Sequence, residues 1–109
     1  MRMAYLLLAA AIVLEVTGTV ALRLSEGFTK PAWSTVVVVG YVGSVVMLSR
    51  ALVAGLPLGI GYAIWAAVGV ALVALIGTMF LAESLTALQV GGLVLVIAGV
   101  VALELGRAQ

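Results

Sequence analysis

The sequence predicts an all-α membrane protein with four transmembrane helices, and three observations lead to this fold class. Of the 109 residues, 66% are hydrophobic and 8% are charged, whereas about a quarter of the residues of a soluble domain are charged. The charged residues divide the chain into uncharged stretches about as long as a membrane crossing. The one stretch that exceeds a single crossing is divided by the dipeptide Leu56-Pro57. This composition excludes a soluble globular enzyme and a disordered tail.

The spacing of the charged residues defines the first two spans. Twenty residues, with one charge among them, lie between Arg2 and Arg23, and nineteen uncharged residues lie between Lys30 and Arg50. A helix rises about 1.5 Å per residue, so about 20 residues cross a hydrocarbon core of roughly 30 Å. We therefore predict spans over about residues 4–22 and 32–49.

The second half of the chain contains the third and fourth spans. Residues 51–82 form an uncharged stretch of thirty-two residues, which is too long for one crossing and too short for two. Proline favours turns and the first turn of a helix, so we expect Pro57 to separate a loop from a helix that begins near Leu58. A further twenty uncharged residues end at Leu103. We predict spans over about residues 58–81 and 85–103, within a single transmembrane domain over residues 1–109.

A cleaved signal peptide is an alternative interpretation of the first span, because Arg2 precedes an apolar run that contains small residues. Glu15 argues against it, since a carboxylate suits the apolar part of a signal peptide badly and seven more, mainly apolar, residues follow. We therefore expect this segment to be a transmembrane helix.

Basic residues are almost evenly divided between the two sides of the membrane. Short loops make each helix antiparallel to its neighbour, which places Arg2, Arg50 and Arg107 on one side and Arg23 and Lys30 on the other. An excess of Lys and Arg on the cytoplasmic side normally sets the orientation. With three basic residues against two, such a chain can insert either way up. A single orientation set by that small excess is the alternative.

The residue types that are absent exclude several kinds of chemistry. The chain has no cysteine, and therefore no disulfide, thiolate nucleophile or thiolate metal site. It has no histidine, the usual proton carrier and a common metal ligand. Its net charge of +1 is too small for nucleic-acid binding. We predict a protein of the lipid bilayer that is not an enzyme, needs no metal or cofactor and binds no nucleic acid.

Glu15 is the one ionisable residue well inside a predicted span. An acidic group there costs roughly 2.5–3.5 kcal/mol on insertion scales, and no residue three or four positions away carries a charge that can pair with it. Burial disfavours the charged form, so this carboxyl group is suited to take up a proton or to hold a cation. The alternative is a protonated glutamate that only joins two helices, although Ser, Thr, Asn and Gln do this more often.

The helical stripe around Glu15 leaves room for a ligand. Positions spaced by three and four residues share one helix face, and the small residues Ala11 and Gly18 leave space beside the carboxylate. Small residues also allow close helix packing, so this feature does not distinguish a pocket from a packing surface. The residues of the stripe are Leu8, Ala11, Ile12, Gly18 and Thr19.

Apart from the aromatic residues near the predicted membrane boundaries, three lie within the spans. Tyr41 is mid-span in the second helix, and Tyr62 and Trp65 share one face of the third. Aromatic faces attract organic cations within about 6 Å, by roughly 2 kcal/mol or more when desolvated. Together with the carboxylate of Glu15, these rings suit a hydrophobic cation. If the carboxylate were absent, the better interpretation would be that the rings only pack against neighbouring helices.

Two antiparallel copies of the chain supply the inverted symmetry that many transporters obtain from internal repeats. If the first span runs over residues 4–22, Glu15 lies about 3 Å from its midpoint, so two such copies hold their carboxylates within about 6 Å of each other in depth. In the fourth span Gly92 and Gly99 lie on one face, and glycine there allows two helix backbones to approach closely in lipid. We expect a dimer interface at this face.

Four segments closely resemble the small multidrug resistance transporters, and the likeness covers essentially the whole chain. Residues 14–19 (LEVTGT) and 22–29 (LRLSEGFT) belong to the first span and the loop that follows it. Residues 57–65 (PLGIGYAIW) begin the third span, and residues 92–100 (GLVLVIAGV) lie in the fourth. Together these motifs are specific to that family.

The resemblance implies a proton-coupled antiporter of the bacterial inner membrane that exports quaternary ammonium and other lipophilic cations, which is multidrug efflux, as an antiparallel homodimer. It implies that Glu15 binds protons and substrate by turns. It also implies that the rings of Tyr41, Tyr62 and Trp65 contact the substrate. The other positions implied to line the pocket are Leu8, Ala11, Ile12, Gly18, Thr19 and Ser44.

Particular positions bear on the subtype. The pair Gly18-Thr19 resembles the drug-exporting branch of the family, whereas the guanidinium-exporting branch tends to carry tryptophan in that region. Ala67 departs from the family pattern at the bend of its third helix, and Val45 and Val46 stand where drug exporters often carry aromatic residues. The alternatives are a guanidinium exporter, one half of a heteromeric pair and a non-transporting membrane assembly factor.

Overall fold

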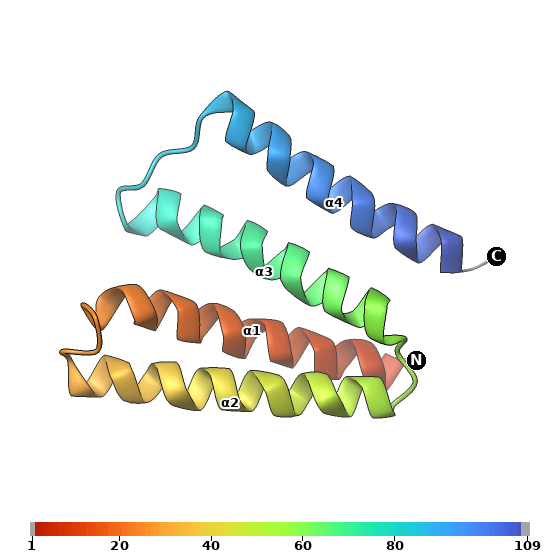
Figure 1. Ribbon diagram of the computed structural model, residues 1–109, viewed down its shortest axis with the longest axis horizontal. Coiled ribbons are helices and arrows are strands. Elements are labelled where there is room, and N and C mark those ends of the chain that lie inside the picture. The colour runs from red at the N-terminus through yellow and green to blue at the C-terminus, as the bar shows by residue number, and fades with distance from the viewer. Residues whose placement is uncertain (1, 108–109) are drawn as a thin grey trace.

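The computed structural model describes residues 2–107, which form four helices (Figure 1). They are α1 (Arg2–Leu24), α2 (Pro31–Val53), α3 (Leu58–Phe80) and α4 (Ala87–Arg107). Each helix is long and apolar enough to cross a membrane. The predicted all-α class with four transmembrane helices is therefore confirmed.

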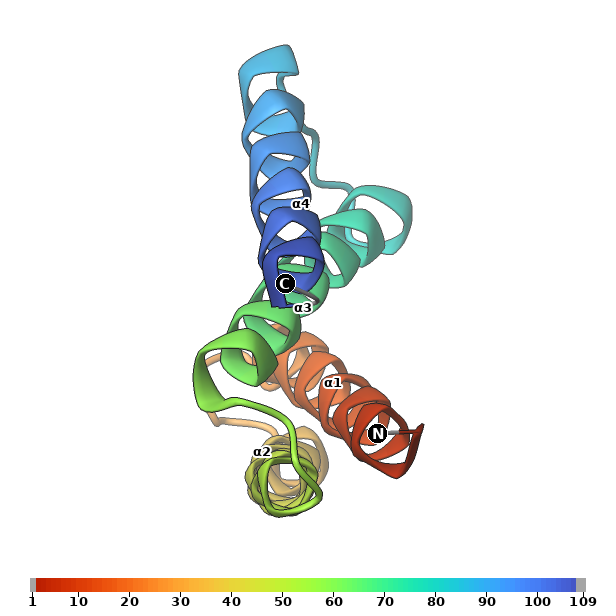
Figure 2. The same ribbon diagram turned by 90° about the vertical axis from the view of Figure 1, so that its right-hand side faces the viewer.

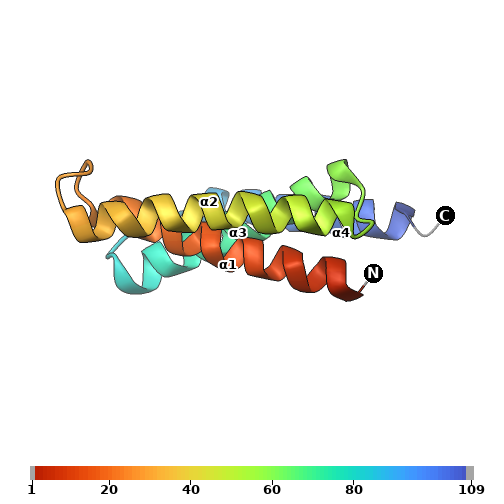
Figure 3. The same ribbon diagram turned by 90° about the horizontal axis from the view of Figure 1, so that it is seen from below.

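Successive helices run antiparallel, so both ends of the chain lie at one end of the molecule, and the α1–α2 and α3–α4 loops lie at the other (Figure 1). Along the helices, α1 and α2 form a pair, α3 lies next to that pair and α4 is outermost (Figure 2). The molecule is flat, with extents of 48 × 34 × 16 Å (Figure 3). No described residue of α4 is buried, so this helix is the least packed part of the protomer.

Glycine allows α1 and α2 to pack closely. A Cβ atom on Gly40 would lie 2.8 Å from the carbonyl oxygen of Leu14 and 3.1 Å from Cα of Gly18. A side chain at residue 40 would therefore push the two helices apart. Their close contact brings the side chains of Tyr41 and Ser44 on α2 against α1.

The core follows one stripe of α1. Its buried residues recur every four positions, which is the spacing of one helix face. They pack against Ala51 near the end of α2 and Leu56 in the α2–α3 loop. The stripe consists of Ala4, Leu8, Ile12 and Val16.

Proline and a reciprocal cap determine where helices begin. Pro57 is the N-cap of α3, and the helix begins at Leu58. The fourth helix begins at Ala87, two residues after the start of the predicted span. There the hydroxyl of Thr86 accepts from the N–H of Gln89, and the side-chain oxygen of Gln89 accepts from the N–H of Thr86. This Thr-x-x-Gln capping box fixes the helix start, and the span prediction did not use it.

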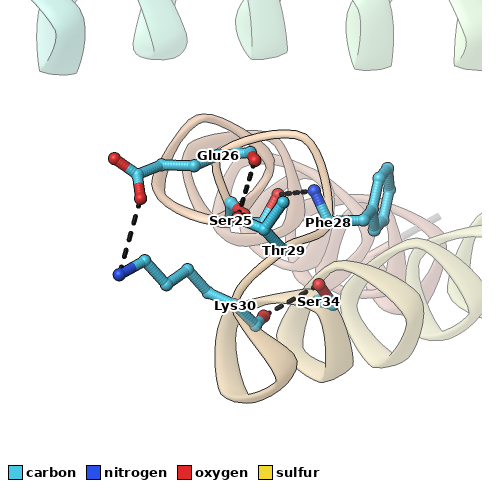
Figure 4. Close-up of polar contacts among 6 residues, drawn as sticks. All are labelled: Ser25, Glu26, Phe28, Thr29, Lys30 and Ser34. Atoms are coloured by element: carbon cyan, nitrogen blue, oxygen red, sulfur yellow. Dashed lines mark hydrogen bonds and ion pairs between the residues drawn. The ribbon is translucent and has the colours of Figure 1, made fainter.

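Ser25 organises the loop between α1 and α2 (Figure 4). Its hydroxyl donates to the carbonyl oxygen of Leu22 and accepts from the N–H of Phe28. The three residues Glu26, Gly27 and Phe28 have positive φ angles of 48°, 74° and 66°. Such angles are unfavourable for residues with a side chain, so the hydrogen bonds of the buried Ser25 stabilise a turn that the local sequence disfavours.

A polar cluster joins the first turns of α1 to the last turn of α4. The hydroxyl of Tyr5 donates to Oε2 of Glu104 at 2.7 Å and accepts from Nη1 of Arg107 at 2.7 Å. The backbones of α1 and α4 make no close contact within the described residues. The end of α4 is therefore connected to α1 through side chains alone.

Candidate functional site

Glu15 lies near the middle of α1, and one of its two carboxylate oxygens is hydrogen-bonded within the described part of the chain. Its Oε1 accepts a hydrogen bond from the hydroxyl of Thr19 at 2.9 Å. Its Oε2 is buried and has no hydrogen-bond partner among residues 2–107. A buried polar atom without a partner is unfavourable, so this oxygen marks a place for a proton or a positively charged ligand.

The hydroxyl of Thr19 connects Glu15 to α2. It lies 2.8 Å from the hydroxyl of Tyr41. Because the Thr19 hydroxyl donates to Glu15, the Tyr41 hydroxyl is the donor in this second bond. The chain of hydrogen bonds runs from Tyr41 through Thr19 to Glu15, and it orients the carboxylate while leaving Oε2 free.

Ser44 on α2 connects α1 and α3 through hydrogen bonds. Its hydroxyl donates to the carbonyl oxygen of Ala11 on α1 at 2.8 Å and accepts from Nε1 of Trp65 on α3 at 3.2 Å. Ser44 is fully buried, so neither bond competes with water. This arrangement fixes the indole ring of Trp65 beside Glu15.

A small cavity lies between Glu15 and α3. It has a volume of about 190 Å³ and is lined by Glu15, Trp65, Ala66 and Val70. Gly69 borders the same carboxylate, since a Cβ atom there would lie 2.8 Å from Oε2 of Glu15. The absence of a side chain at residue 69 leaves space for the free oxygen.

The remaining predicted site residues have different surroundings. Tyr62 lies beside Trp65, with ring centroids 5.6 Å apart and planes inclined by 48°, but it is 56% exposed and does not line the cavity at Glu15. Leu8 and Ile12 are buried in the protomer core. In this arrangement they serve packing, and their expected place in a substrate pocket stays a prediction.

The two glycines expected at a dimer interface are both exposed on α4. A Cβ atom on Gly92 or Gly99 would meet no atom within 4 Å. Gly99 also borders an apolar groove of about 380 Å³ between α3 and α4. Within residues 2–107, no three His, Cys, Asp or Glu side chains are grouped so that they could hold a metal ion.

Comparison with known proteins identifies the family. The family model described as Small Multidrug Resistance protein matches residues 3–96. The chain belongs to this family. Multidrug resistance protein mmr of Mycolicibacterium paratuberculosis is 40% identical over 107 residues, which cover 97% of this chain and 99% of that one. Multidrug resistance protein EbrB of Bacillus subtilis is 45% identical over 104 residues, covering 94% of this chain and 87% of EbrB.

A third relative of this small multidrug resistance protein is described as a pump subunit. The nicotine metabolites export pump subunit NepB of Paenarthrobacter nicotinovorans is 42% identical over 106 residues, which cover 97% of this chain and 63% of NepB. Family membership and the four apolar helices make the present chain a multi-pass bacterial membrane transporter and not an enzyme. These parts of the sequence-based prediction are confirmed.

Sequence reasoning missed Gly69 and Val70 in this small multidrug resistance protein. It treated the residues after Trp65 as the region of a helix bend, whereas the structure places them against Glu15. A signal was present, since Gly69 lies four residues after Trp65 and so shares its helix face. The rotation of α3 relative to α1, which the spacing does not reveal, decides that this face meets the carboxylate.

Proposed function

We propose that this small multidrug resistance protein exports lipophilic cations, quaternary ammonium compounds among them, in exchange for protons. The observation that carries the proposal is the environment of Glu15. Thr19 holds one carboxylate oxygen, while the other is buried, has no partner among the described residues, and lies beside a cavity that Trp65 lines. The printed names of the relatives, two multidrug resistance proteins and an export pump subunit, support export.

A single carboxylate that binds either a proton or a cation couples the two movements. When Glu15 is protonated, a buried cation finds no counter-charge and is strongly disfavoured. When Glu15 is ionised, the cation offsets its charge and the proton has left. Binding of the cation therefore releases a proton, and an inward proton gradient drives the cation outward.

The surroundings of Glu15 favour an organic cation over a hydrated inorganic one. Apart from the carboxylate, the cavity is lined by the indole of Trp65 and by the apolar residues Ala66 and Val70. An aromatic face attracts an organic cation most strongly when both are removed from water. Tyr62 stands beside Trp65 and extends the aromatic surface toward the outside of the protomer.

We propose that the working unit is an antiparallel homodimer. One cavity of about 190 Å³ is below the range of about 300–1,000 Å³ that is usual for sites of drug-sized ligands, and two copies that meet near Glu15 would combine their cavities. The exposed face of α4 with Gly92 and Gly99 supports an interface between copies. The near balance of basic residues on the two sides supports insertion in both orientations.

Titration of the purified protein with tetraphenylphosphonium tests the exchange of cation and proton. We expect affinity to fall as the pH falls, and calorimetry in two buffers of different ionisation enthalpy to detect proton release. Glu15→Gln removes the charge at constant size and should abolish binding. Glu26→Gln removes the exposed carboxylate that pairs with Lys30 in the α1–α2 loop (Figure 4), and should leave binding unchanged. Full affinity in Glu15→Gln, or uptake without proton release, rejects the proposal.

The antiparallel arrangement has its own test. A tag or a single introduced cysteine at the C-terminus should be accessible from both sides of the membrane in intact cells and inverted vesicles. Labelling from one side only, in every copy, rejects the antiparallel homodimer without affecting the role of Glu15.

A heteromeric pair is the second candidate, because the relative NepB is described as a pump subunit. Expression of this chain alone decides between the two. Resistance to a quaternary ammonium compound conferred by the single chain supports the homodimer, and resistance that needs a second family member supports the pair.

A further inference from the structure

The ion pair between Arg23 and Glu83 differs from the others in the described part of the chain. Nη1 of Arg23 lies 2.8 Å from Oε2 of Glu83, and the two residues are 60 positions apart. The other two ion pairs among residues 2–107 join residues three or four positions apart. Among the ion pairs between described residues, the Arg23–Glu83 pair is therefore the one that connects separate elements, namely the end of α1 and the α3–α4 loop.

The end of α3 folds Glu83 back over its own helix. Ala82 has a positive φ of 58°, and the N–H groups of Leu81 and Glu83 both donate to the carbonyl oxygen of Gly77. The carboxylate of Glu83 then occupies the space that a side chain at residue 77 would need, since a Cβ atom on Gly77 would lie 3.1 Å from Cδ of Glu83. The carboxylate thus lies against α3 at Gly77, although half of the side chain stays exposed.

A cavity leads from this ion pair toward Glu15. It has a volume of about 280 Å³, and Arg23 and Glu83 line it together with Thr19 and apolar residues of α1 and α3. Thr19 is the residue whose hydroxyl donates to Glu15. Arg23 lies eight residues after Glu15, which is about 12 Å along the helix. The cavity therefore connects the loop end of the protomer to the hydrogen-bond chain of the central site.

We propose that this cavity is a second, outer binding site for the lipophilic cation, and that the cation replaces Arg23 as the partner of Glu83. The inference rests on the proposed export function. This cavity shares one feature with the central site, a carboxylate beside apolar walls, which here include Leu22 and Val73. The side chains of Arg23 and Glu83 are 61% and 50% exposed, and ion pairs of this kind contribute little to stability. An organic cation can therefore displace the guanidinium, and the guanidinium closes the site again when the cation leaves.

Nuclear magnetic resonance of the full-length protein in lipid nanodiscs tests the outer site. In the Glu15→Gln background the central site is disabled, and tetraphenylphosphonium is titrated while the backbone amide of Gly77 is observed. We expect a saturable shift of this resonance, lost when Glu83→Gln is added. Glu26→Gln is the matched control, because it also removes an exposed, paired carboxylate at the loop end of the molecule. Arg23→Gln removes the internal competitor and should tighten the outer site by about threefold or more.

Tetraphenylborate separates a charged site from simple partitioning, because it has the same shape and the opposite charge. A shift of Gly77 with tetraphenylborate in Arg23→Gln, which lacks the guanidinium that would pair with the anion, or an unchanged shift in Glu83→Gln, means partitioning only and overturns the outer site. An unperturbed Gly77 resonance while the wild-type protein binds tetraphenylphosphonium at Glu15 also overturns it and leaves the proposed function standing. Full affinity of Glu15→Gln at the central site overturns the proposed function instead.

Discussion

Oε2 of Glu15 lies against the backbone of Gly69, so close that a Cβ atom on the glycine would stand 2.8 Å from the oxygen. Two helices contribute to this contact, and neither residue is near the other in sequence. The glycine leaves the free carboxylate oxygen room beside the cavity at Trp65. The position of this oxygen thus depends on the absence of a side chain at residue 69.

Gly69→Ala should weaken tetraphenylphosphonium binding by about tenfold or more, because the added methyl group forces the carboxylate to turn or α3 to move. Gly59→Ala is the matched control, since Gly59 lies on the same helix and its Cβ position is empty within 4 Å. Equilibrium binding in the same detergent compares the two variants. Equal affinity in both would show that the contact at residue 69 is unimportant.

Thr19→Val keeps the shape of the side chain and removes the hydroxyl that contacts Glu15 and Tyr41. A hydrogen bond to a charged group contributes about 1.5–3 kcal/mol, so cation affinity at neutral pH should fall by about tenfold or more. Thr17→Val is the control, because the exposed Thr17 hydroxyl donates only to the carbonyl oxygen of Val13 on its own helix. A decrease of the same size in both variants contradicts a specific role for Thr19.

Ser44→Ala removes the group that joins Trp65 to the Ala11 carbonyl oxygen. In a Trp33→Phe background, Trp65 is the remaining tryptophan, and its fluorescence anisotropy should fall because the indole N–H loses its partner. Its response to tetraphenylphosphonium should weaken as well. Ser34→Ala, on the same helix, removes a hydroxyl that donates to the carbonyl oxygen of Lys30 and should change neither signal. Unaltered anisotropy in Ser44→Ala contradicts the positioning role.

Tyr5→Phe breaks the side-chain link between α1 and α4, since the Tyr5 hydroxyl both donates to Glu104 and accepts from Arg107. Loss of a partner for partly buried charged groups costs about 1–3 kcal/mol. Unfolding by a sodium dodecyl sulfate series should show this loss of stability. Tyr62→Phe is the control, because the Tyr62 hydroxyl has no hydrogen-bond partner in the described part of the chain. Equal midpoints for the two variants contradict the structural role of Tyr5.

The number of helices and the identity of the central acidic residue were predictable from the sequence. Both depend on the positions of the charged residues along the chain. Charged residues are costly inside the hydrocarbon core, and the thickness of the core sets the length of an uncharged span. The start of α4 at Ala87 was predictable in principle from Thr86 and Gln89, because a capping box is local. The length of the uncharged stretch alone does not locate this cap.

The pairing of side chains across helices was not predictable in this way. Leu8 and Ile12 share a stripe with Glu15 by spacing, yet they pack into the core. Glu83 lies between the predicted third and fourth spans, yet the turn at Ala82 places its side chain against α3 and Arg23. Spacing identifies which residues share a face and does not identify which face a neighbouring helix covers.

Hydrophobicity and charge along the chain were sufficient to establish a membrane protein with one acidic residue, Glu15, whose burial in the bilayer is unfavourable. The free energy of transfer into lipid depends on the composition of a segment more than on how the helices are arranged. The close approach of α1 and α2 at Gly40 and the rotation of α3 that brings Gly69 to Glu15 arise only when the helices pack. Packing depends on the shapes of surfaces that meet in three dimensions. The bond from Thr19 to one carboxylate oxygen is local to α1, whereas packing against α3 decides that the other oxygen is buried beside Gly69 without a partner among the described residues.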